Sequence, residues 1–214
     1  MARSFPRSSL RTVALLGRET GLSVLESALL NNDAVDLAGV ITLGNLPKSE
    51  GGGRRPELAA YERLCDNNHI PLTVLNFPEA LNVEQYLPEN LDLMVVLSWR
   101  FIIRPAALER LAVGGINLHR GALPSYAGAE PVRRAIEAGE ARTAITAHWL
   151  AEEIDMGPEL ARVWLDLPMA GTSSGSSAEQ AERVKKSLFS LYAPLARLAI
   201  EAVKAGQPAG KINP

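Results

Sequence analysis

The sequence predicts an α/β protein with a doubly wound, mostly parallel sheet. Short apolar runs of strand length alternate with helix-length segments through the first half of the chain. Leu91–Leu97 (LDLMVVL) is apolar at nearly every position, which is typical of a strand buried on both faces of a parallel sheet. The 214 residues, of which 47% are hydrophobic and 21% charged, suffice for one substantial core.

The elements of the first half follow in order. Leucines at helical spacing (Leu22, Leu25 and Leu29) come after the first strand. The Gly-rich stretch Lys48–Arg55 indicates a mobile loop, and Pro56 suits the first position of a helix that runs to about Asn68. The expected strands are Thr12–Leu16, Asp36–Leu43, Pro71–Leu75 and Leu91–Leu97. Such alternation is typical of βαβ units.

The second half is less regular. A Gly- and Pro-rich stretch, Arg120–Gly128, separates its first strand from the rest. After a Gly/Ser linker, Gly171–Ser177, a final helix is expected, with Ser177 and Gln180 as a capping box and an interruption near Pro194. The other expected elements are a helix over Glu130–Ala138 and strands over Gly114–Leu118, Thr143–Leu150 and Glu159–Leu167.

Composition narrows the classes of function. The formal net charge of −2 argues against a nucleic-acid partner, and no apolar run approaches the length needed to cross a membrane. The short apolar run Val13–Leu16 does not make a signal peptide, and the single cysteine fits a reducing compartment, so we expect a cytoplasmic protein. Residues 1–10 are expected to be a flexible lead-in and residues 11–210 a single catalytic domain.

Common enzyme motifs are absent from the sequence. Gly17–Gly21 (GRETG) is too poor in glycine for a dinucleotide-binding turn, and no phosphate-binding loop or serine-hydrolase motif is present. The histidines His69, His119 and His148 are far apart in sequence without the spacing of metal ligands, so no metal is expected.

Two segments carry residues suited to acyl transfer. Asn117 and His119 alternate along a strand that ends at the irregular loop, so both side chains lie on one face. Asp155 follows in the acidic turn Glu152–Pro158. An amide, an imidazole and a carboxylate can stabilise an oxyanion and move a proton. Taken singly, each residue has an ordinary structural interpretation, as a turn residue or solvated surface.

The same segments resemble the folate-dependent formyltransferase family. The string Asn117–Gly128 (NLHRGALPSYAG), with Pro131 after it, is similar to the family's signature. Thr146 and then Ile154–Pro158 (IDMGP) resemble its second motif, and Asp92–Pro105 resembles the strand and turn beside its pterin pocket. The resemblance implies a Rossmann-like fold and 10-formyltetrahydrofolate as the formyl donor.

The resemblance also implies roles for individual residues. Asn117, His119 and Asp155 become the catalytic trio. The residues implied to bind the folate are Phe101, Ile102, Ile103, Leu108, Leu150, Glu152 and Ile154. The sequence departs from the family pattern at Arg120-Gly121, where Pro-Ser is usual, and at Ala127 and Ala144, where a basic residue and a glycine are common.

The acceptor is expected to be the primary amine of a small molecule, an amino sugar or an amino-acid-like compound. Glu19 stands where the glycinamide ribonucleotide enzymes cradle a phosphate, and we expect no counterpart of the extra β-domain of the methionyl-tRNA enzymes after the last helix. The alternatives are a formyltetrahydrofolate hydrolase, a glycinamide ribonucleotide-type transformylase and, more weakly, a folate-binding module without turnover. Arg120, Arg133 and Arg134 are open candidates for ligand contact, and the apolar last helix is a candidate homodimer interface.

Overall fold

The computed structural model describes residues 8–167 and 175–207. The chain divides into two compact units, with the boundary between Ile116 and Asn117. Strand β5 (Leu111–His119) crosses this boundary, so residues 117–119 belong to the second unit. Residues 1–7 of the expected lead-in lie outside the described part, and Leu10, its last residue, already opens the first strand. The single domain over residues 11–210 stays a prediction.

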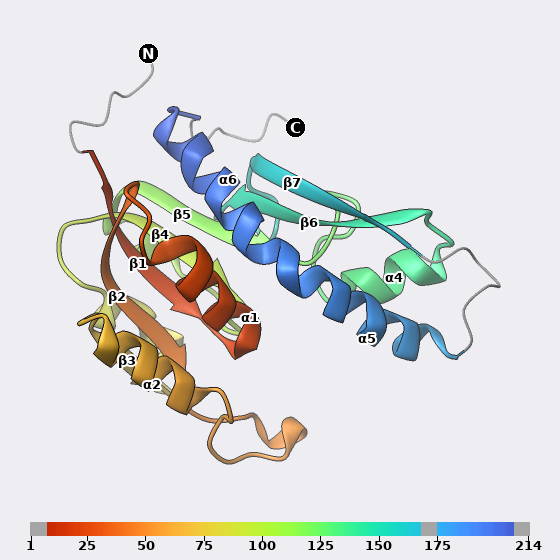
Figure 1. The fold of residues 1–214 in the computed structure, drawn as a ribbon, viewed down its shortest axis with the longest axis horizontal. Coiled ribbons are helices and arrows are strands. Elements are labelled where there is room, and N and C mark those ends of the chain that lie inside the picture. Colours follow the sequence, from red (N-terminus) through yellow and green to blue (C-terminus); the bar gives the residue numbers. More distant parts are fainter. Residues whose placement is uncertain (1–7, 168–174, 208–214) are drawn as a thin grey trace. The chain divides into compact units, whose positions relative to one another are not determined.

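The first unit contains the four strands expected in the first half of the chain, with bounds that differ by at most two residues, whereas β5 begins at Leu111, three residues before the expected start at Gly114. Helix α2 packs against β3 in this unit (Figure 1). Its elements are β1 (Leu10–Leu16), α1 (Arg18–Val24), a π-helical turn (Leu25–Leu29), β2 (Val35–Leu43), a 3₁₀ turn (Lys48–Glu50), α2 (Leu58–Asn67), β3 (Leu72–Leu75), 3₁₀ turns (Glu79–Tyr86), β4 (Leu91–Leu97), α3 (Pro105–Leu108) and the start of β5.

The core of the first unit follows from its apolar strands. β1 pairs in parallel with β2 on one side and with β4 on the other, and β2 pairs in parallel with β3. Val13–Leu16 is fully buried, as expected for a strand whose two faces are both covered. The Gly-rich segment expected as a loop contains the Lys48–Glu50 turn, and a β-bridge joins Asn45 to Arg54 at its ends.

The second unit is built on a β-hairpin. β6 and β7 are antiparallel, α6 lies against both of them, and α4 packs against α5 (Figure 1). After the end of β5, the elements are α4 (Pro131–Glu137), β6 (Arg142–Trp149), β7 (Glu159–Asp166), α5 (Ser177–Leu188), a 3₁₀ turn (Phe189–Leu191) and α6 (Tyr192–Lys204).

The start and the interruption of the final helix are both described. The expected capping box of Ser177 and Gln180 is wrong by one residue, because the Ser176 hydroxyl accepts from the Glu179 N–H and the Glu179 carboxylate accepts from the Ser176 N–H. Ser177 donates instead to Glu137. The interruption expected near Pro194 is confirmed, since α5 ends at Leu188 and Pro194 lies in the first turn of α6. The linker residues 171–174 lie outside the described residues.

The described strands form one seven-stranded sheet in the order β3-β2-β1-β4-β5-β6-β7. With the parallel pairs among β1–β4 and the antiparallel β6–β7 pair, the predicted α/β class with a mostly parallel sheet is confirmed. Within residues 8–167 and 175–207, we find no helix of the length and apolar character needed to span a bilayer.

Candidate active site

Asn117 and His119 end strand β5 at the start of the second unit. Leu118 between them is buried in the core, and His119 is itself buried, with 8% of its surface exposed. The alternation of a strand therefore turns the amide and the imidazole to the same side, as the sequence predicts.

Asp155 brings a carboxylate to this amide and imidazole. Its Oδ2 lies 3.2 Å from His119 Nδ1, and its Oδ1 accepts a hydrogen bond of 3.3 Å from Asn117 Nδ2. The backbone N–H of Gly128 donates to Oδ2 at 2.9 Å. Asp155 adopts a left-handed conformation (φ 57°), which an aspartate tolerates better than most residues. The three side chains implied to be catalytic thus meet within one unit.

The loop that carries Asp155 is closed by a tight approach at Gly157. The N–H of Trp149 donates to the carbonyl of Pro158 at 2.9 Å, which joins the two ends of the loop. A Cβ on Gly157 would lie 1.6 Å from the carbonyl oxygen of Trp149. Only glycine fits this approach, so Gly157, inside the predicted acidic turn, constrains the path of the loop that carries the carboxylate.

Replacing Gly157 with alanine should therefore destabilise the protein. Because the new methyl group meets backbone, the loop has to move, and overpacking of this kind costs about 1–3 kcal/mol. We expect a lower midpoint in thermal unfolding and reduced binding of whatever ligand needs Asp155. Met156→Ala, in the same loop, is the control and should change the unfolding free energy by less than about 0.5 kcal/mol. Equal midpoints for the two variants would contradict this account of the loop.

His119 has a second partner that the sequence does not reveal. Its Nε2 lies 2.8 Å from the carbonyl oxygen of Tyr126, so both ring nitrogens face an oxygen acceptor. A Cβ on Gly121 would lie 2.7 Å from that carbonyl and 2.9 Å from His119 Nε2. The Gly121 departure from the family pattern therefore leaves room for this contact. Thr146 fixes the same loop by donating to the Gly121 carbonyl at 2.7 Å.

Burial and neighbouring charge act in opposite directions on His119. Burial lowers the pKa of His119 and outweighs the effects of Asp155 and the Tyr126 carbonyl, which raise it; His148 and Arg120 lower it further. At neutral pH the ring is therefore mainly neutral and able to accept a proton. Once protonated, it has an acceptor at each nitrogen.

The carboxyl group of Asp155 is held in its ionised form. Burial would raise its pKa, but the contact with His148, the charge of His119 and the N–H of Gly128 together hold the pKa of Asp155 below its ordinary value. An ionised carboxylate next to a neutral imidazole is suited to stabilising the imidazolium as it forms.

His148 is a site residue that the sequence analysis does not assign. Its ring centroid lies 6.3 Å from that of His119, and its Nε2 is 3.1 Å from Asn117 Nδ2 and 3.5 Å from Asp155 Oδ1. The two histidines are therefore close in space although they are distant in sequence. Among the described residues, no group of three or more His, Cys, Asp or Glu side chains is arranged to hold a metal ion.

The residues implied to bind the folate fall in both units. In the first unit, Ile102 is 68% exposed, and the ring of Phe101 packs edge-on against Trp99 with centroids 6.1 Å apart. Ile103 is half-buried, and Leu108 is half-buried at the end of α3. In the second unit, Leu150 is half-buried, Glu152 is exposed and Ile154 is 65% exposed.

The three candidate arginines differ in their contacts. Arg120 donates from Nε to the buried hydroxyl of Tyr192 in α6 at 3.1 Å. Arg133 pairs with Glu137 at 2.7 Å on the surface of α4. Arg134 donates to the Ala127 carbonyl and lies 5.8 Å from the ring centroid of Tyr126. Arg134, on α4, therefore contacts the loop Arg120–Gly128, whose Tyr126 carbonyl faces His119.

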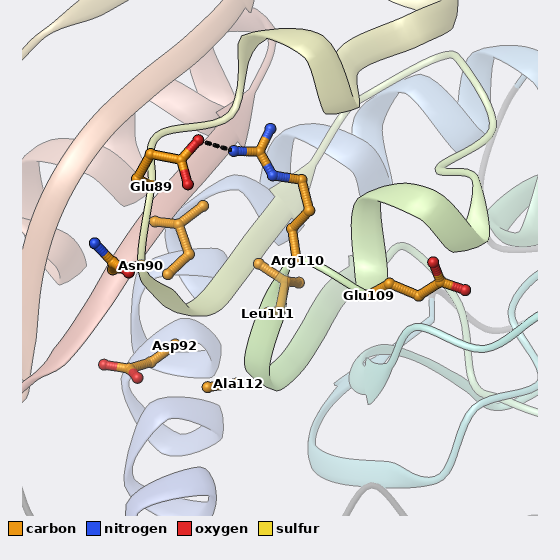
Figure 2. Close-up of a pocket in the computed structure, with 8 residues that line it drawn as sticks. Glu89, Asn90, Asp92, Glu109, Arg110, Leu111 and Ala112 are labelled. Carbon is orange, nitrogen blue, oxygen red and sulfur yellow. Dashed lines mark hydrogen bonds and ion pairs between the residues drawn. The ribbon is translucent and has the colours of Figure 1, made fainter.

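A hollow of about 530 Å³ lies at the amino-terminal ends of strands β4 and β5 in the first unit (Figure 2). Arg110 and Glu89 pair at 2.8 Å on its wall, and Leu111 and Ala112 belong to the first residues of β5. Asn117 and His119 are at the carboxyl end of that strand, where ligands bind in open α/β sheets. This hollow is therefore not part of the candidate active site.

A comparison with protein families agrees with the motifs. The model of a family described as formyl transferase matches residues 12–189. The chain belongs to the formyl transferase family. This confirms the resemblance on which the residue roles were based.

Individual relatives belong to the same family. The chain is 30% identical over 145 residues to a methionyl-tRNA formyltransferase of Nitratidesulfovibrio vulgaris, covering 68% of this chain and 44% of that protein. A methionyl-tRNA formyltransferase of a Thermotoga species is 29% identical over 144 residues, again with 44% of its length covered. The chain thus spans less than half the length of these curated relatives.

Solved structures share the fold. A phosphoribosylglycinamide formyltransferase from Coxiella burnetii aligns over 93% of this chain and 89% of its own, with a TM-score of 0.69 and 21% identity. A formyltetrahydrofolate deformylase from Pseudomonas syringae pv. tomato aligns over 92% of this chain and 61% of its own, with a TM-score of 0.65 and 18% identity.

Proposed function

We propose that this chain transfers the formyl group of 10-formyltetrahydrofolate to the primary amine of a small molecule. The observation that carries the proposal is the meeting of Asn117, His119 and Asp155 in one unit, with contacts of 3.2 and 3.3 Å to the carboxylate. Membership of the formyl transferase family supports the same chemistry.

The reaction requires these residues to stabilise an oxyanion and to accept a proton. The amine nitrogen attacks the formyl carbon, a C–N bond forms, and the formyl oxygen becomes an oxyanion. The amine then loses a proton, the bond from the carbon to the folate N10 breaks, and tetrahydrofolate leaves with a proton on that nitrogen. Hydrogen-bond donors stabilise the oxyanion, and a base takes the proton.

Asn117, His119 and Asp155 can together accept the proton and stabilise the oxyanion. His119 is neutral because burial lowers its pKa. It accepts the proton of the amine, which the ionised Asp155 beside it passes on. The N–H groups of Asn117 and of the protonated ring are the donors for the oxyanion. Each of these donors already has a partner in this structure, so the formyl oxygen has to replace one of them.

The folate positions support the proposal within each unit separately. Ile102 and Ile154 are large apolar side chains exposed on loops that follow strands β4 and β6. Such exposure suits residues that pack against a planar ligand such as a pterin. Within the first unit, the backbone groups of Phe101–Ile103 would then meet the donor and acceptor edge of the ring.

The residues at the start of α1 favour an amine substrate that places no phosphate at the amino terminus of this helix. Arg18, its first residue, donates to Glu50 at 2.9 Å, and Glu19 adds negative charge to the first turn. A phosphate is favoured at a helix N-terminus by positive potential, which these carboxylates reduce. We therefore favour an amino sugar or an amino-acid-like amine over a glycinamide ribonucleotide.

The proposal is tested by following 10-formyltetrahydrofolate with and without amines. We expect slow loss of the formyl group from donor and protein alone. Adding a panel of amino sugars, nucleotide-linked amino sugars and amino acids should give a product heavier by one formyl group in mass spectrometry. Rapid deformylation without any amine would identify a hydrolase instead, and formylation of glycinamide ribonucleotide alone would overturn the argument from α1.

A further inference from the structure

His148 is a buried imidazole that the proposed reaction does not use. It is 1% exposed, so water does not solvate its ring nitrogens, and protein groups have to satisfy them. Nδ1 lies 2.9 Å from the carbonyl oxygen of Trp149, and Nε2 lies 3.1 Å from Asn117 Nδ2. The ring thus connects a backbone carbonyl at the end of β6 to the amide of the trio.

The Trp149 carbonyl selects the position of the proton on this ring. A carbonyl oxygen only accepts hydrogen bonds, so Nδ1 has to carry the hydrogen at 2.9 Å. A neutral imidazole has one N–H, which leaves a lone pair on Nε2. The alternative, an N–H on Nε2 aimed at Asp155 Oδ1, has 3.5 Å to span and would place the Nδ1 lone pair against the carbonyl.

A lone pair on Nε2 determines which end of the Asn117 amide faces it. The NH₂ end donates one hydrogen to His148 Nε2 at 3.1 Å and the other to Asp155 Oδ1 at 3.3 Å. When a formyl oxygen takes over the longer of these bonds, the bond to His148 still holds the amide plane. Without His148, the amide would be free to rotate at the moment when its N–H is needed.

We infer that His148 is a positioning residue, which accepts one N–H of Asn117 and so aims the other N–H at the formyl oxygen. The inference rests on the proposed function. It assigns His148 no contact with the donor or the acceptor. Its effect is therefore expected in kcat, with little change in KM for the folate.

Three substitutions separate positioning from a purely structural role. His148→Gln places an acceptor near the position of Nε2 but loses the donor to Trp149. His148→Asn keeps a donor for Trp149 and loses the acceptor for Asn117. His148→Phe loses both while filling the ring's space. Misplacing a catalytic group by about 1 Å can cost about 10²-fold in rate, so we expect that loss in kcat for the Asn and Phe variants and a loss within about tenfold for Gln.

The order of the variants decides the inference. Positioning predicts higher kcat for His148→Gln than for His148→Asn, although His148→Asn keeps the bond to Trp149 and should unfold at the higher temperature. If kcat follows the unfolding temperatures instead, with Asn above Gln, the role is structural and the inference fails.

A measurement without turnover distinguishes this inference from the proposed function. We would record nitrogen-15 spectra of the imidazoles in the wild type. The His148 signals are assigned as those missing from His148→Gln. They should show Nδ1 protonated and Nε2 unprotonated near pH 7.5. A proton on Nε2 would overturn the inference whatever the enzyme does. If the tautomer is as expected but no amine is formylated, the proposed function fails and the assigned orientation of Asn117 stands.

Discussion

Asp155→Asn is expected to lower the rate of formyl transfer by about 10²–10³-fold while the protein stays folded. Asparagine keeps an oxygen that can accept from the Gly128 N–H, so the loop retains that contact. It removes the negative charge that lies 3.2 Å from His119 Nδ1, and with it the group that stabilises the imidazolium. Initial rates with saturating 10-formyltetrahydrofolate and an accepted amine measure this loss.

Glu153→Gln is the matched control for Asp155→Asn. Glu153 is an exposed carboxylate in the same loop, so its replacement removes the same charge without touching the trio. We expect its rate to stay within about twofold of the wild type, as for other exposed positions. If Asp155→Asn also retained the wild-type rate at an unchanged unfolding temperature, Asp155 would have no part in the chemistry.

His119→Ala should lose a similar factor of about 10²–10³ in turnover, because it removes both the base and a donor for the oxyanion. In the wild type, kcat/KM should fall as the pH decreases through the pKa of His119, which burial holds below 6.5. Below that pKa the ring is already protonated and cannot accept the proton of the amine. The acid limb of the pH profile measures this pKa.

His69→Asn is the control for the histidine substitution. His69 is exposed, lies after α2 in the first unit and has a left-handed backbone (φ 56°) that asparagine tolerates. Its variant should keep both the rate and the acid limb. A wild-type acid limb that falls above pH 6.5 would contradict the argument that burial controls His119.

The strands and the trio could be predicted because their signals are local or periodic. Leu91–Leu97 is a continuous apolar run, and β4 has the same bounds. Asn117 and His119 are two residues apart in a strand, which places them on one face whatever lies around them. The meeting with Asp155 was implied by the family resemblance, and the structure brings the three side chains together.

The remaining contacts of the site could not be predicted from local sequence. The register of β6 against β7 shifts between Ala147 and His148, so the alternation of that strand does not show where His148 points. The partners at Tyr126 and Trp149 are backbone carbonyls, which every residue has. The opposing effects on the pKa of His119 depend on burial, which the sequence around it does not determine.

The central claim is that the cluster of Asn117, His119 and Asp155 moves a formyl group from folate to an amine. It is tested most directly by giving the protein 10-formyltetrahydrofolate labelled with carbon-13 in the formyl group, together with an amine from the panel, and following the label by NMR. In the wild type the signal should move from the folate to a formamide at a rate that Asp155→Asn reduces by about 10²-fold or more. Transfer at equal rates in both proteins, or a wild-type protein that binds the labelled folate yet formylates none of the amines, would contradict the account.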